Sequence, residues 1–140
     1  MSAIPITTSL IGSFRKHFGA IRAVMAQFEQ AGIHVLSPKP SDVIDPRVEF
    51  VILASDNPMH TEEEIELIAL HRILRSSFVY TYNPNGYIGR TTCYEIGRLV
   101  ERKVPVFFQE KPHDFCTFRN SLCHTELQLY FSCIFLRGPV

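Results

Sequence analysis

Short β-branched, apolar runs alternate with segments of helical periodicity along most of the chain, and this alternation restricts the fold more than any other feature. The runs typical of strands cover residues 4–11, 33–36, 48–54, 78–82 and 104–108. The segments with helical periodicity lie at 14–28, 61–76 and 92–103. When helices connect successive strands of one sheet, the strands run parallel and helices cover both faces. We therefore predict an α/β fold, flavodoxin- or Rossmann-like, with a parallel sheet of about five strands.

Residues with capping preferences indicate where the expected helices begin and end. Ser13 stands at the N-cap position of the first helix, and Gly32 closes that helix at the C′ position. Thr61 and Glu64 have the T-x-x-E spacing of a capping box, which predicts the start of the second helix. The Pro- and Asp-rich stretch 38–47 is expected to be a loop.

The chain has no internal repeat and no composition shift typical of a domain boundary, so residues 1–140 are expected to form a single domain. Residues 111–140 are a C-terminal extension of that domain. Within it, a helix is expected over 115–122, and Leu127–Leu136 is either a strand or a buried helix. That apolar segment joins the domain's own core or forms a subunit interface.

Charge and cysteine content narrow the classes of partner and compartment. Lys+Arg and Asp+Glu balance at 14 each, so the chain lacks the electrostatic footprint of a nucleic-acid binder. No apolar run approaches the ~20 residues of a membrane-spanning helix, and the first residues do not resemble a signal peptide. Because four cysteines in a chain of this length are more typical of reduced thiols than of a disulfide scaffold, we expect a cytoplasmic protein.

The C-terminal cysteines and histidines raise the question of a zinc site. Structural zinc sites favour pairs of cysteines two to four residues apart. The candidate ligands in this chain are His113, Cys116, Cys123, His124 and Cys133. Their spacing differs from that of structural zinc sites, so no metal is expected.

Two segments, Leu10–Arg15 and Asn83–Glu95, are expected at the carboxyl ends of strands, where ligands collect in such sheets. The second begins with a turn signal and leads into a helix start, where backbone N–H groups can hold an anion such as a phosphate. Glu95 is expected in the first turn of that helix, and its carboxylate could attack an anomeric carbon. Thr92 and Glu95 also have capping-box spacing, so in the alternative interpretation Glu95 only satisfies backbone donors.

The segment Asn83–Gly89 (NPNGYIG), followed by Glu95-Ile96-Gly97, resembles the signature of the nucleoside 2-deoxyribosyltransferase family. The resemblance covers about residues 7–110 and includes the Gly-Ser that leads into the first helix. It implies cleavage of the N-glycosidic bond of a nucleoside or nucleoside 5′-monophosphate, with Glu95 as the nucleophile that attacks C1′. Either water or a second base accepts the sugar, which leaves hydrolase and transferase open. It also implies that no metal or redox cofactor is needed and that the chain forms a homodimer or a larger homo-oligomer.

Other residues of the two segments, and one histidine of the preceding helix, are candidates for binding the sugar, the phosphate or the base. Ser13 could instead serve only as an N-cap, and Tyr87, His71 and Arg90 could pack locally or face solvent. The candidate substrate-binding residues are Ser9, Gly12, Ser13, His71, Asn83, Gly86, Tyr87, Gly89 and Arg90.

Members of that family often carry an aspartate in the helix before the signature strand or at the start of that strand, where this chain has Ala69 and Ser77. Some members also carry an aspartate six residues before the glutamate, where this chain has Gly89. Glu66, Asp56 or Glu64 could take over its role. An alternative to an enzyme is therefore a non-catalytic module of the same fold that binds or senses nucleotides.

Overall fold

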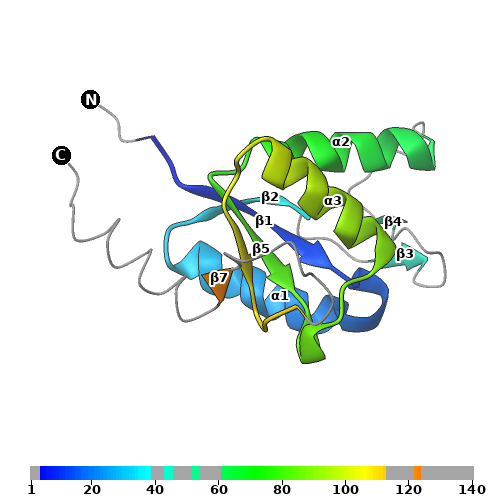
Figure 1. Cartoon of the computed structure of the whole chain (residues 1–140), viewed down its shortest axis with the longest axis horizontal. Helices are drawn as coiled ribbons and strands as arrows, with labels where there is room; N and C mark the ends of the chain where they lie inside the picture. Colours follow the sequence, from blue (N-terminus) through cyan, green and yellow to red (C-terminus); the bar gives the residue numbers. More distant parts are fainter. Residues whose placement is uncertain (1–3, 39–42, 46–51, 54–60, 113–121, 124–140) are drawn as a thin grey trace.

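The computed structural model describes residues 4–38, 43–45, 52–53, 61–112 and 122–123. Its main sheet is parallel throughout and has the strand order β2-β1-β5-β6-β7 (Figure 1). Four strands form its body, and the two-residue β7 extends one edge. The predicted α/β class with a parallel sheet is confirmed. The strands are β1 (Thr7–Gly12), β2 (His34–Ser37), β5 (Phe78–Tyr82), β6 (Val106–Phe108) and β7 (Leu122–Cys123).

Among the described residues, three α-helices cover the two faces of this sheet, as the alternation predicts. Helix α1 (Phe14–Gln30) lies on one face, whereas α2 (Glu62–Leu74) and α3 (Arg90–Glu101) lie side by side on the other (Figure 1). Each face has its own apolar cluster, and β5 contributes to both because alternate residues of a strand point in opposite directions. None of the described helices is long and apolar enough to cross a membrane.

A small antiparallel hairpin, β3 (Val43–Asp45) and β4 (Ile52–Leu53), lies in the connection between β2 and α2. The prediction that 38–47 is entirely loop is therefore wrong at β3. The proline and aspartate content of the stretch hid a three-residue strand whose ladder depends on a partner farther along the chain. β4 falls within the expected strand 48–54, but it pairs antiparallel with β3 and does not join the parallel sheet as expected; the fifth strand of the main sheet is β7.

The predicted helix ends are largely confirmed. Gly32 has φ +81 and forms a Schellman cap, in which its own N–H donates to Glu29 O and the Ile33 N–H donates to Phe28 O. Thr61 and Glu64 form the reciprocal capping box. Ser13 occupies the N-cap position of α1, but its side chain makes no capping hydrogen bond.

Helix α3 begins at Arg90 with Gly89 as its N-cap, two residues earlier than expected. Threonine is a favoured N-cap residue, which made Thr92 the expected start, but the turn before the helix already directs Gly89 into that position. At its other end, Val104 closes the helix cap instead of starting a strand, and β6 begins only at Val106.

The C-terminal predictions lie mostly outside the described residues. Leu122, expected at the end of a helix, instead begins β7 and pairs with Phe107 of β6. Segments 115–121 and Leu127–Leu136 are not among the described residues, nor are His113, Cys116, His124 and Cys133.

Lys103 adopts a left-handed conformation, with φ 58, at the end of α3. Its N–H donates to Val100 O at 3.1 Å, and the Val104 N–H donates to Leu99 O at 3.0 Å, which completes a Schellman cap without the usual glycine.

We expect Lys103→Gly to raise the free energy of unfolding by about 0.5–1 kcal/mol, because glycine adopts this conformation without the steric cost borne by other residues. Chemical denaturation measures the change. Arg102→Gly is the matched control, since Arg102 has a right-handed conformation and glycine there should destabilise the protein. Equal destabilisation by the two substitutions would contradict the assigned cap.

Candidate functional site

The sheet has its topological switch point between β1 and β5. The chain leaves β1 through α1 on one face, and it leaves β5 through α3 on the opposite face. The two strands are neighbours in parallel register, with Gly12 opposite Tyr82 at their carboxyl ends. In open α/β sheets, ligands bind in the crevice that such a divergence creates.

A cleft of about 290 Å³ lies at this switch point. Its walls come from the first turns of α1, the end of β5 with the loop after it, and the beginning of α3. The lining residues are Gly12, Ser13, Lys16, His17, Tyr82, Pro84, Asn85, Tyr87, Gly89 and Thr92.

Gly12 allows the ends of β1 and β5 to approach closely. Its φ is +148, and a Cβ built on it would lie 2.5 Å from the backbone oxygen of Tyr82. Any side chain at this position would therefore push the strand ends apart or alter the backbone that leads into α1. The cleft depends on a glycine here for steric reasons alone.

The first two turns of α1 bring two basic residues to the cleft. Lys16 Nζ lies 5.3 Å from the centroid of the Tyr87 ring, and both residues line the cleft. His17 departs from helical geometry (φ −130, ψ 22), and its ring meets that of Tyr82 edge to face, with centroids 5.6 Å apart. No residue in the first turn of α1 is acidic.

The turn after β5 is held in place by the side chain of Asn83, which forms hydrogen bonds with the main chain. Asn83 is 1% exposed; its Nδ2 donates to Glu110 O at 2.7 Å, and the Glu110 N–H donates to its Oδ1 at 3.1 Å. Asn85 and Gly86 then take left-handed conformations, which confirms the predicted tight turn. Both polar ends of the Asn83 amide are thus occupied by main chain rather than offered to a ligand.

The start of α3 forms the remaining wall. Gly89 is its N-cap and offers no side chain to cap the first N–H groups. Thr92, in the first turn, is 5% exposed and lines the cleft. Arg90 is exposed and is not one of the lining residues.

Glu95 lies in the second turn of α3, one turn beyond Thr92, and not in the first turn as expected. The capping-box interpretation is also wrong, because the N-cap of α3 is Gly89 and Glu95 is too far along the helix to reach its N-terminal donors. The side chain is partly buried. Burial, and secondarily the charge of Glu66 on α2, raises the pKa of Glu95 to about 8.

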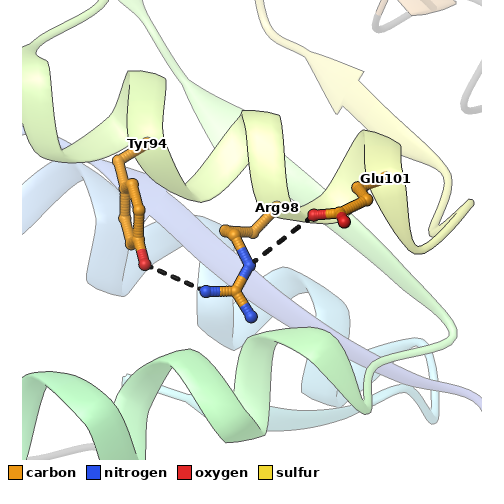
Figure 2. Close-up of polar contacts among 3 residues, drawn as sticks. All are labelled: Tyr94, Arg98 and Glu101. Carbon is orange, nitrogen blue, oxygen red and sulfur yellow. Dashed lines mark hydrogen bonds and ion pairs between the residues drawn. The ribbon is translucent and has the colours of Figure 1, made fainter.

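No hydrogen bond or ion pair joins the Glu95 carboxyl group to the other residues that the structure describes. The guanidinium of Arg98, one turn farther along α3, is already engaged by two other residues. Its Nη1 donates to Tyr94 Oη at 2.9 Å, and its Nε lies 4.0 Å from Glu101 Oε2 (Figure 2). Among the described residues, the Glu95 carboxyl group therefore has no hydrogen-bond or ion-pair partner that would offset its burial.

Of the predicted binding residues, the structure brings Gly12, Ser13, Tyr87 and Gly89 together in the cleft. Ser9 lies in the buried middle of β1, where its hydroxyl is 2.7 Å from Ser76 Oγ. The remaining predicted binding residues do not line the cleft; they are His71, Asn83, Gly86 and Arg90. Glu95 does not line the cleft either.

The sequence interpretation missed Lys16, His17, Tyr82, Pro84, Asn85 and Thr92. A signal for the first two was present, because they follow Gly12-Ser13 by three and four residues and so fall in the opening turns of a helix at the carboxyl edge. Thr92 was considered only as a cap. Nothing in the sequence indicated that Thr92, and not Thr91, would line the cleft.

Within the described residues there is no cluster of three or more His, Cys, Asp or Glu that could hold a metal ion. Comparisons of the whole chain with family models, curated proteins and solved structures give no match. The geometry at the β1–β5 switch point, together with the family resemblance of the sequence, is therefore the basis for a functional proposal.

We expect Gly12→Ala to lower the free energy of unfolding by about 2 kcal/mol or more, because the new Cβ would overlap the Tyr82 carbonyl oxygen. Denaturant titration measures the loss. Gly19→Ala in α1 is the control: nothing lies within 4 Å of its added Cβ, so a neutral or stabilising effect is expected there. A Gly12→Ala protein as stable as wild type would contradict the close approach.

Glu95→Gln should stabilise the protein, and increasingly so at alkaline pH. A carboxyl pKa raised from 4.5 to about 8 means that the folded state retains a proton which the unfolded chain releases, so the wild type loses stability as pH rises between these values. Glutamine does not titrate, and we expect its advantage to grow by about 1 kcal/mol or more between pH 5 and pH 8.5.

Paired denaturation curves at the two pH values test this expectation. The control is Glu101→Gln on the same helix, which replaces an exposed carboxylate and should gain no such advantage. An advantage of Glu95→Gln that is the same at both pH values would show that the carboxyl group titrates normally.

Proposed function

We propose that the protein cleaves the N-glycosidic bond of a nucleoside or nucleoside 5′-monophosphate, or transfers its sugar, with Glu95 as the nucleophile. The observation that carries the proposal is the partly buried Glu95 carboxyl group, which lacks a partner among the described residues and lies one helical turn from the cleft. Burying an ionisable group without a partner lowers stability, and such groups concentrate at catalytic sites.

The reaction needs only carboxyl groups and positioning. The Glu95 carboxylate attacks C1′ while the bond from C1′ to the base nitrogen breaks, and its electron pair leaves with the base, which takes up a proton. A glycosyl ester on Glu95 results. Attack on C1′ by water or by a nitrogen of a second base then releases Glu95 as a carboxylate and gives hydrolysis or transfer, respectively.

The short distance along α3 between Thr92 and Glu95 supports a catalytic role for Glu95 beside the cleft. Thr92 lines the cleft, and Glu95 follows three residues later, a rise of roughly 4.5 Å along the helix axis. The proposed reaction therefore requires a sugar that extends from the cleft along α3, past Thr92, so that its anomeric carbon reaches Glu95. The rings of Tyr82 and Tyr87 offer the apolar surface on which sugars and bases commonly pack.

Among the three carboxylates that could replace the family's aspartate, Glu66 has the best support as the group that orients the sugar. It lies on α2, which packs beside α3, and its charge acts on Glu95. Glu64 is occupied by the capping box of α2, and Asp56 is outside the described residues.

A second candidate, a non-catalytic nucleotide-binding module, is favoured by one specific observation. None of the described residues that line the cleft carries a carboxyl group, and a pKa of about 8 keeps most of Glu95 protonated at neutral pH. This candidate predicts thermal stabilisation by nucleotides without any release of free base.

Chromatographic measurement of free base distinguishes the two candidates. Purified protein would be incubated with ribo- and deoxyribonucleosides and their 5′-monophosphates, with and without an acceptor base. We expect base release that falls by at least about 10³-fold in Glu95→Ala and Glu95→Gln, since both remove the nucleophile. Wild-type rates in either variant would eliminate Glu95 as the nucleophile, and stabilisation without release by the wild type would favour the module.

The pH dependence of kcat/KM provides a second readout. Only the ionised carboxylate attacks, so kcat/KM should rise with pH and level off above about 8, the pKa of Glu95 in the free protein. If Glu95 were instead the proton donor, kcat/KM would fall as pH rises through the same value. Glu101→Gln, on the exposed side of α3, should leave the profile unchanged.

A further inference from the structure

Two helix N-termini converge on the cleft. Ser13, the N-cap of α1, and Gly89, the N-cap of α3, both line it, and neither provides a side-chain capping bond. The first N–H groups of a helix have no intrahelical acceptor, and they carry the positive end of the helix dipole. The cleft therefore collects unpaired donors and partial positive charge from two directions.

The third described helix begins in the opposite way. Helix α2 opens with three consecutive glutamates, Glu62–Glu64, and Thr61 completes a capping box. By contrast, the first turns of α1 and α3 contain no acidic residue. The two uncapped helix starts are thus the two that face the cleft. Their N–H groups lack the negative partner that α2 supplies from its own sequence.

Side chains add to this positive character. Lys16 lines the cleft, and none of the described residues that line it is acidic. Among the described residues, Lys16 has no carboxylate partner and makes only the contact with the Tyr87 ring. The charge of Lys16 is therefore available to a ligand.

An independent observation comes from Thr92. Its side chain is 5% exposed and lines the cleft, yet its hydroxyl makes no hydrogen bond to the residues that the structure describes. Within the described ranges, the side-chain atoms that are sealed from solvent without a partner are Thr81 Oγ1 and Gln109 Oε1, so the Thr92 oxygen remains accessible in the cleft, where water or a ligand can bond it. Thr92 thus supplies a hydroxyl donor to the cleft from the first turn of α3.

We propose that this cleft binds the phosphate group of a phosphate monoester through the starts of α1 and α3, Lys16 and Thr92. A tetrahedral phosphate accepts hydrogen bonds from several directions at once, which matches donors that come from two helices and a threonine. The inference rests on the proposed function in one respect: it makes the substrate a nucleoside 5′-monophosphate and not a free nucleoside. With the phosphate in the cleft, the ribose extends toward Glu95, one turn beyond Thr92.

Ribose 5-phosphate is the appropriate probe, because it carries the monoester but no base and cannot undergo the proposed reaction. Its affinity for the full-length protein would be measured by calorimetry beside ribose, inorganic phosphate and chloride at matched ionic strength. We expect ribose 5-phosphate to bind at least about tenfold more tightly than ribose. Lys16→Met and Thr92→Val should each weaken its binding by about tenfold.

Lys103→Met is the matched control, since Lys103 is exposed and lies at the opposite end of α3; its affinity should equal that of wild type. Binding that survives both Lys16→Met and Thr92→Val would overturn the inference. So would equal affinity for ribose and ribose 5-phosphate, or binding of inorganic phosphate alone. Release of base from nucleosides without affinity for ribose 5-phosphate would leave the enzyme proposal standing and remove the phosphate site.

Discussion

The parallel pairing of β1 with β5 is the interaction on which the other features depend. Both strands are buried, and each contributes to the apolar clusters on both faces of the sheet, so the three helices pack against a common pair of strands. Because the chain leaves these strands toward opposite faces, their carboxyl ends are also where the starts of α1 and α3 come together. The absence of a side chain at Gly12 lets the pairing continue to the last residue, Tyr82. Core and cleft are therefore determined by one strand pair.

Glu95 represents a conflict between stability and reactivity within a single helix. The same face of α3 buries Ile96 and Leu99 in the apolar cluster, and a partly buried carboxyl group beside them loses hydration without gaining a hydrogen bond from the described chain. A chain selected for stability alone would pair this group or replace it. The proposed role of Glu95 as the nucleophile accounts for this loss of stability, because a poorly solvated carboxylate is a stronger nucleophile than one surrounded by donors.

The sequence predicted the fold class well and the site only in part, and the reasons are physical. Helices and strands were recognisable because their apolar periods differ, and local signals such as Gly32 act within a few residues. Segment β3 was missed because the stretch around it is rich in proline and aspartate, which disfavour strands, and its partner β4 lies outside that stretch. Ser9 and Asn83 were assigned to ligand binding because the sequence gives a residue's polarity but not its partner. In the structure Ser76 lies beside the first, and the backbone of Glu110 pairs with the second.

Asn83 has a consequence for how the sheet ends. Its carboxamide gives one hydrogen bond to the carbonyl of Glu110 and takes one from the N–H of the same residue. It thus behaves as a peptide group supplied by a side chain, and it follows directly after the backbone bond from the Gln109 N–H to Thr81 O. The Asn83 side chain therefore adds one more pair of hydrogen bonds to the ladder between β5 and the segment that follows β6, and the main chain at position 83 can turn away from the sheet. An aspartate has the same shape but lacks the donor, so it could form only half of this rung. The loop that walls the cleft can therefore bend sharply away from the sheet while it stays anchored to the neighbouring strand's extension.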